Sequence, residues 1–226
     1  DWSGHAMKPR TTTHAHSAAP LEASRRAAIS GRIALPPPAP LDMRLDECLK
    51  KRRSTRDYAQ TPVPLQQLST LLWAAQGITS PGGLRTAPSA GAIYPLKSYV
   101  LAFRVQGLAA GFYSFDPEQQ ALALLAKGSK QDQVAKICGG QHCVAECAAG
   151  LLLTAWYGRL RREYGEAAEQ LALIEAGHIG QNWHLAAAAL GLGSVSIGKI
   201  DSMAIKLLLP IPQDEHPLYM LIAGQR

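Results

Sequence analysis

The spacing of apolar residues predicts several helices in the body of the chain. Apolar side chains recur with a helical period over residues 45–49, just after Asp42, which can cap a helix. The same period returns over residues 65–75, and Gly77 marks the end of that second helix. Three further helices are expected over residues 134–147, 170–190 and 202–208. The folded part of the chain therefore begins near Leu41.

Shorter apolar stretches predict strands between these helices. Residues 111–115 and 121–125 indicate a hairpin whose turn contains Asp116 and Pro117. Four more strands are expected over residues 98–105, 150–156, 194–197 and 218–223. Because helices and strands follow one another without a regular βαβ alternation, the pattern indicates the α+β class.

The first 40 residues have a different composition. They are rich in Ala, Thr, His and Pro, and residues 35–40 read Leu-Pro-Pro-Pro-Ala-Pro, which is typical of an extended polyproline segment. We interpret residues 1–40 as an N-terminal arm or tag, with a short helix at 21–29, and residues 41–226 as the folded domain. His5, His14 and His16 would permit metal binding, but a polar arm is the favoured interpretation.

Composition limits the class of protein. The chain has 226 residues, of which 47% are apolar and 18% charged, as expected for one globular domain with an arm. No apolar run reaches the roughly 18 residues of a membrane span. If Met7 is the natural start, the absence of a following apolar signal core predicts a cytoplasmic protein; if Asp1 is a mature terminus, a periplasmic one is expected.

The formal charge of +6 favours anionic partners and is concentrated locally. Arg52, Arg53, Ser54 and Arg56 lie within five residues, just after a predicted helix. Guanidinium groups bind phosphate through two parallel hydrogen bonds, and a serine hydroxyl adds a neutral donor. From the residues alone, two other interpretations remain, a solvated helix end and a nucleic-acid-binding patch. Because aromatic residues do not alternate with these charges, we expect a local phosphate site and no nucleic-acid partner.

Two glycine-containing segments could approach a ligand closely. Residues 85–96 form a loop of small residues bounded by Pro and Gly, which admits a flat molecule near the backbone, although an ordinary loop has the same composition. Residues 191–198 do not match the dinucleotide fingerprint, because the third glycine comes one residue late and the segment precedes a strand. Gly198 could still offer a backbone N–H.

Cysteine and histidine residues give weaker signals. His142 lies near Cys138, Cys143 and Cys147, but the surroundings are apolar and a second ligand pair does not stand out, so we expect no metal there. His178 and His184 lie in the long Ala-rich helix, where histidine is more often structural than an acid or base. We assign no catalytic residue.

Taken in order, these segments resemble the nitroreductase superfamily, and within it the SagB-type dehydrogenases. The resemblance covers the chain from about residue 41 to its end. It rests on residues 51–58, 71–77, 85–96, 111–116, 175–182, 190–194 and 197–198. It implies a nitroreductase-like fold with a mixed central sheet flanked by helices, and an intertwined homodimer with FMN at the interface.

The resemblance also implies roles for individual residues. The FMN phosphate would contact Arg52, Arg53, Ser54 and Arg56, with Arg226 as a further contact. The other subunit would line the flavin with Pro88, Ser89, Ala90 and Gly91. The ring would lie beside Ser196, Ile197, Gly198 and Lys199, with a backbone N–H near N5.

The implied activity is oxidoreduction with FMN. NAD(P)H would reduce a nitroarene or quinone in a ping-pong cycle; the alternatives are a flavin dehydrogenase or oxidase acting on a peptide or small molecule, and a non-catalytic flavin-binding subunit. Residues 167–170 depart from the family pattern Arg-Gly-Tyr-Arg that follows Tyr164-Gly165-Glu166, which leaves the substrate class open. The expected partners are a second copy of the chain and small molecules, with no nucleic acid and no membrane.

Overall fold

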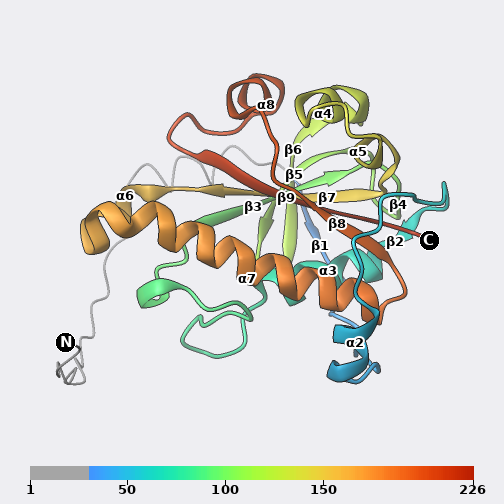
Figure 1. Cartoon of the computed structure of the whole chain (residues 1–226), viewed down its shortest axis with the longest axis horizontal. Helices are drawn as coiled ribbons and strands as arrows, with labels where there is room; N and C mark the ends of the chain where they lie inside the picture. Colours follow the sequence, from blue (N-terminus) through green and yellow to red (C-terminus); the bar gives the residue numbers. More distant parts are fainter. Residues whose placement is uncertain (1–30) are drawn as a thin grey trace. The chain divides into compact units, whose positions relative to one another are not determined.

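The computed structural model of the protein describes residues 31–226. A seven-stranded sheet runs through this part of the chain, and helices cover both of its faces (Figure 1). The predicted helix at 21–29 and the three N-terminal histidines lie outside the described residues. Within the described part of the chain, none of the helices is long and apolar enough to cross a membrane.

The strands follow the order β1-β6-β5-β3-β7-β9-β8 across the sheet, and every neighbouring pair is antiparallel. Their bounds are β1 (Arg32–Ala34), β3 (Leu96–Ala102), β5 (Gly111–Asp116), β6 (Ala121–Lys127), β7 (Ala149–Ala155), β8 (Gly193–Ile197) and β9 (His216–Gly224). Parallel pairing occurs in the short pair β2 (Val63–Pro64) and β4 (Val105–Gln106), and at a bridge from Ser54 to Ser194. The predicted α+β fold is confirmed, with a mostly antiparallel sheet.

Two groups of helices enclose the sheet (Figure 1). On one face lie α3 (Leu65–Gln76) and the long α7 (Ala168–Ala189), with α2 (Leu45–Lys51) packed on α7. The other face carries α4 (Gln131–Ile137), α5 (His142–Glu146) and α8 (Ser202–Leu208). The remaining helices are α6 (Tyr157–Tyr164) and the 3-10 turns η1 (Ala90–Ala92) and η2 (Gly165–Ala167). The candidate site segments are residues 52–58, beside β8, and residues 85–94, which contact α7.

Alternation along the central strands explains why the sheet has a core on each face. In β7, Leu151 and Leu153 belong to the core under α3 and α7, whereas Leu152 belongs to the core under α4, α5 and α8. Successive side chains of a strand point to opposite faces. All seven residues of β7 are buried, so this strand reads in the sequence as one continuous apolar run.

The boundary predicted at residue 41 is wrong for residues 31–40, which belong to the folded body. β1 pairs with β6 through Ile33 and Leu122, and Leu35 is buried. The proline carbonyls that follow accept hydrogen bonds from α3: Ser69 donates to Pro36 and Gln66 donates to Pro37. A polyproline segment forms no internal hydrogen bonds, so its carbonyls are free to accept such donors.

The helix predicted over 134–147 is two helices. Gly139 and Gly140 have φ of +79° and +73°, a left-handed conformation that ends α4 before α5 begins. By contrast, α3 ends at Gly77 and α8 spans residues 202–208, both as predicted. Among the helices of the described residues, α6 was missed, because only Tyr157 and Leu160 of its eight residues are buried.

Candidate functional site

The arginine segment, residues 52–58, lies beside β8 and is held there by its backbone. Thr55 donates its backbone N–H to the Ser194 carbonyl at 2.9 Å, next to the bridge between Ser54 and Ser194. Gly193 makes this approach possible, since a Cβ at that position would lie 2.7 Å from the Thr55 methyl carbon. Tyr58 donates its hydroxyl to the Thr55 carbonyl at 2.7 Å.

The side chains of the arginine segment are directed to the surface. Arg53, Ser54 and Arg56 are exposed and Arg52 is half-buried. Among the described residues, none of the three arginines forms an ion pair with a carboxylate, whereas the preceding Lys50 and Lys51 pair with Asp46 and Glu47. Arg53 donates one guanidinium N–H to the Arg52 carbonyl at 2.7 Å. The remaining guanidinium N–H groups and the Ser54 hydroxyl, on a fixed backbone, match the donors that a phosphate needs. This donor set fits the phosphate of FMN.

Beneath this segment, His184 of α7 links two serines of β8. Its Nδ1 lies 2.8 Å from the Ser194 hydroxyl and its Nε2 lies 2.7 Å from the Ser196 hydroxyl. Burial and the neighbouring Arg52 charge lower the pKa of His184 to about 4, so the ring is neutral at pH 7. One ring nitrogen donates and the other accepts, which fixes Ser196, a predicted site residue, in one orientation. The structure thus gives His184 a structural role.

The other predicted residues near β8 lie at its two ends. Arg226 is exposed and follows Gln225, whose carbonyl accepts a hydrogen bond from Ala59 after the arginine segment. Gly198 and Lys199 are exposed at the far end of β8, beyond the buried Ile197. The Lys199 side chain covers Gly139 in the turn between α4 and α5, where an added Cβ would meet it at 3.2 Å. β8 therefore connects the arginine segment at one end with Gly198 and Lys199 at the other.

The flavin loop, which we define as residues 85–94, has an unusual backbone. Gly91, Ala92 and Tyr94 have φ of +57°, +51° and +51°. Residues with a Cβ rarely adopt this conformation, and such strain concentrates at functional sites. Pro88 and Gly91 are exposed, whereas Ala90 and Ser89 are half-buried.

The flavin loop contacts α7 directly, whereas the arginine segment is tied to β8, whose serines bond to His184 of α7. Asn182 donates its side-chain amide to the Thr86 carbonyl at 3.2 Å, and the buried Glu175 lies near Ser89 and Arg85 of the loop. Glu175 and His184 are nine residues apart, or about 14 Å along the helix axis. Within the described residues of one chain, no hydrogen bond or ion pair joins Pro88–Gly91 to Arg52–Arg56. The sequence expectation that the loop serves the other subunit's site stays a prediction.

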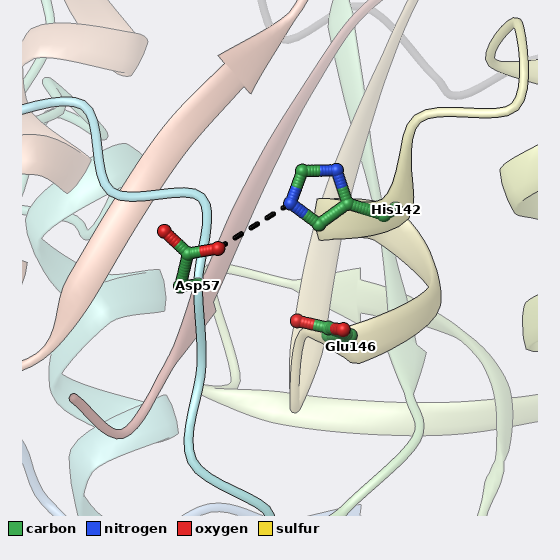
Figure 2. Close-up of side chains that lie close together, drawn as sticks. All are labelled: Asp57, His142 and Glu146. Carbon is green, nitrogen blue, oxygen red and sulfur yellow. Dashed lines mark ion pairs between the residues drawn. The ribbon is translucent and has the colours of Figure 1, made fainter.

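Asp57 of the arginine segment lies in a group of three titratable side chains, of which two are exposed and Glu146 is half-buried. Figure 2 shows Asp57 and His142 facing one another, with Glu146 on the same helix as His142. His142 Nε2 lies 3.4 Å from Asp57 Oδ1, and the ligand atoms of all three side chains lie within 4.8 Å of one another. These residues could hold a metal ion. The sequence did not indicate Asp57 and Glu146, because Asp57 is distant in sequence from His142 and because the cysteines near His142 are the more usual metal ligands.

The neighbouring cysteines are buried free thiols. Burial raises the pKa of Cys138 to about 11 and also raises the pKa of Cys143 and Cys147. A reactive or metal-binding cysteine needs a lowered pKa. These three thiols therefore pack as small apolar groups, as the sequence predicted.

An apolar hollow of about 350 Å³ lies between α2, α3 and α7. It is lined by Leu41, Met43, Leu45, Cys48, Trp73, Ala74, Thr86, Asn182, Leu185 and Ala186. Two of the lining side chains are large and exposed, Leu41 at 36% and Leu45 at 66%. Apolar surface of this kind marks a contact with another molecule.

Comparison with known proteins identifies the family of the chain. The model of the nitroreductase family matches residues 49–225. A protein of Methanocaldococcus jannaschii with a provisional nitroreductase name is 36% identical over 185 residues, which are 82% of this chain and 92% of that protein.

Two solved structures show the same fold. A protein of Ralstonia eutropha, also provisionally named a nitroreductase, has a TM-score of 0.76 and 32% identity, covering 86% of this chain and 89% of that one. An NADPH:FMN oxidoreductase of Vibrio harveyi, solved with NAD⁺, has a TM-score of 0.58 and 20% identity, covering 80% and 68% of the two chains. At that identity the second likeness is one of fold.

Proposed function

Because the chain belongs to the nitroreductase family, we propose that it is an FMN-dependent oxidoreductase that passes hydride from NAD(P)H to a small organic acceptor. The observation that carries the proposal is that, within residues 31–226, the guanidinium groups of Arg52, Arg53 and Arg56 have no carboxylate partner. Their backbone is fixed against β8, so a phosphate would meet donors that are already in place. Arg226 follows Gln225, whose carbonyl accepts a hydrogen bond from Ala59, and would add a further positive charge.

Bound FMN would supply the hydride chemistry, and the chain would supply position and electrostatics. The arginine segment would hold the phosphate, and Ser196, fixed by His184, would lie beside the ring together with Ile197, Gly198 and Lys199. Pro88, Ser89, Ala90 and Gly91 would shape the opposite side. Donor and acceptor would then use one site in turn, which is a ping-pong cycle. We assign no acid or base in that cycle.

We also propose that the active form is a homodimer. The exposed apolar residues Leu41, Leu45, Leu49, Leu173 and Ile174 support an interface along α2 and α7. Such an interface would bring the flavin loop of one subunit toward the arginine segment of its partner. Within one chain, no hydrogen bond or ion pair of the described residues joins the two segments. Light scattering on the purified full chain should give twice the mass of the monomer.

The test of the function is a spectrum of the purified full chain, reconstituted with FMN. We expect the absorption bands of oxidised flavin, their loss when NADH or NADPH is added without oxygen, and their return with a quinone. A protein that cannot take up FMN would overturn the proposal. A protein that holds FMN but is reduced by neither nicotinamide would be the non-catalytic flavin-binding subunit, or an enzyme that takes electrons from a peptide or another small molecule.

A further inference from the structure

Asp57, His142 and Glu146 form a cluster of three metal-binding side chains, which we call the ligand cluster. Figure 2 shows the Asp57 carboxylate and the His142 ring facing one another, with the Glu146 carboxylate beside them. His142 and Glu146 are four residues apart on α5, and this spacing places both on one face of the helix. Asp57 comes from the arginine segment. One imidazole nitrogen and two carboxylates are ligands that Zn²⁺ accepts.

The separations within the ligand cluster fit a small divalent ion. In a tetrahedral zinc site, bonds of about 2.0–2.2 Å to nitrogen and oxygen place two ligand atoms about 3.3–3.5 Å apart. His142 Nε2 and Asp57 Oδ1 are 3.4 Å apart, and the ligand atoms of all three side chains lie within 4.8 Å of one another. One edge of such a tetrahedron is therefore present, and the third ligand lies close to it.

The backbone that carries the three ligands is held together without a metal ion. The Arg104 guanidinium, from the turn between β3 and β4, donates to the Ala59 carbonyl at 3.5 Å and to the Glu146 carbonyl at 2.5 Å. It therefore joins the chain just after Asp57 to the end of α5. Ligands that are held in place before binding lose less entropy when the ion binds, which raises affinity.

The charges around the ligand cluster also favour a cation. Among the described residues, neither Asp57 nor Glu146 forms an ion pair with a lysine or an arginine, and the partner of Asp57 is His142. A divalent ion would compensate both carboxylates. Cys143, the neighbour of His142 in the chain, is buried, and burial raises the pKa of its thiol, so the cysteine does not compete as a ligand.

We propose that Asp57, His142 and Glu146 bind a zinc ion, with water as the fourth ligand. The imidazole selects against Mg²⁺ and Ca²⁺, which prefer oxygen ligands alone. The Asp57 and His142 side chains are 95% and 62% exposed, so the fourth position is open to solvent. The ion would tie the arginine segment to α5 and stabilise the fold. This inference goes beyond the proposed function and does not rest on it.

The first test is calorimetric titration of the full chain with ZnCl₂, after dialysis against EDTA and removal of the chelator. His5, His14 and His16 would also permit zinc binding, so the result is read from variants of the ligand cluster. Loss of an outer partner of a metal ligand lowers affinity by about 10–100-fold, so His142→Gln and Asp57→Asn should each weaken binding by about 100-fold or more. Glu118→Gln, which changes an exposed carboxylate outside the cluster, should bind zinc as the wild type does.

The second test is thermal unfolding of the same proteins. Zinc at about 100 times its Kd should raise the unfolding midpoint of the wild type by about 5 °C or more, and Mg²⁺ at the same concentration should not. The variant with His5, His14 and His16 all replaced by alanine should keep this response, and His142→Gln should lose it. With EDTA present, wild type and His142→Gln should unfold at nearly the same temperature, because an exposed ion pair contributes little.

Two results would overturn the inference. One is zinc binding of equal strength in the wild type, His142→Gln and Asp57→Asn. The other is a zinc response that disappears with the three N-terminal histidines. Neither measurement uses FMN, so failure to bind FMN would contradict the proposed function and leave these tests intact.

Discussion

The arginine segment and the flavin loop are held in opposite ways. The arginine segment is fixed by backbone bonds to β8, and its arginines have no carboxylate partner among the described residues. The flavin loop is fixed by half-buried side chains, and its exposed residues Pro88 and Gly91 carry no charge. The first segment is suited to capture an anion and the second to present a shape. The two segments therefore differ both in their chemistry and in the way the fold supports them.

This difference predicts that the two segments fail differently when they are changed. Removing charge from the arginine segment should alter binding and leave the fold intact, because its side chains contact little of the protein. Changes behind the flavin loop should alter stability and pH dependence, because buried polar groups are involved.

The largest effect is expected from Arg52→Ala combined with Arg56→Ala. Two charge-assisted hydrogen bonds to phosphate would be lost, so FMN affinity should fall by about 100-fold or more. Titration with FMN followed by flavin fluorescence measures it. The matched control is Arg161→Ala, which removes an exposed arginine of α6 that pairs with Glu169. Unchanged flavin content in the double variant would refute the role of the arginine segment.

Glu175→Gln should change how the stability of the protein depends on pH. The unfolded chain ionises Glu175 near pH 4.5 and the folded chain near pH 7, so the folded state binds more protons between these values. The free energy of unfolding of the wild type should therefore decrease as pH rises through this interval, by about 1–3 kcal/mol relative to the variant. Urea unfolding at pH 5 and pH 8 tests this. A constant difference between wild type and variant would contradict it.

A smaller effect is expected where the arginine segment meets β8. An added methyl group in Gly193→Ala would meet Thr55 at 2.7 Å and push the segment outward, at a cost of about 1–2 kcal/mol. FMN affinity should fall together with stability. Gly177→Ala is the control, because a Cβ there meets nothing within 4 Å and alanine favours the helix. If the two variants bind FMN equally, the close approach does not position the arginines.

The smallest effect is expected at the exposed pair of His142 and Asp57. Their side chains are 62% and 95% exposed, so water screens the interaction. Without added metal ion, His142→Gln should change the free energy of unfolding by less than about 0.5 kcal/mol and leave FMN affinity unchanged. A large loss in either property, measured by urea unfolding and by titration, would mean that these charges serve the site.

The fold was predictable where a local signal was complete. Gly77 after an apolar helix and the turn at Asp116 gave correct ends for α3 and for β5. β1 was missed because Ile33 and Leu35 become strand residues only through the distant β6. Parts of the site that depend on such distant contacts, such as Ser54 beside Ser194, could not be predicted from the sequence.

The site residues were named through the resemblance to the family rather than by the pattern alone. The run from Arg52 to Arg56 reads equally as a solvated helix end, and only its freedom from carboxylate partners distinguishes it in the structure. Glu175 gave no signal in the sequence, since one acid in an Ala-rich helix is ordinary and its burial depends on the packing of residues 85–94.

The most direct test of the account compares FMN with riboflavin, which has the same ring and ribityl chain but no phosphate. If the arginine segment anchors the phosphate, the wild-type protein should bind FMN about 100-fold more tightly than riboflavin, and Arg52→Ala with Arg56→Ala should abolish most of that preference. Equal affinity of the wild-type protein for FMN and riboflavin would contradict the account.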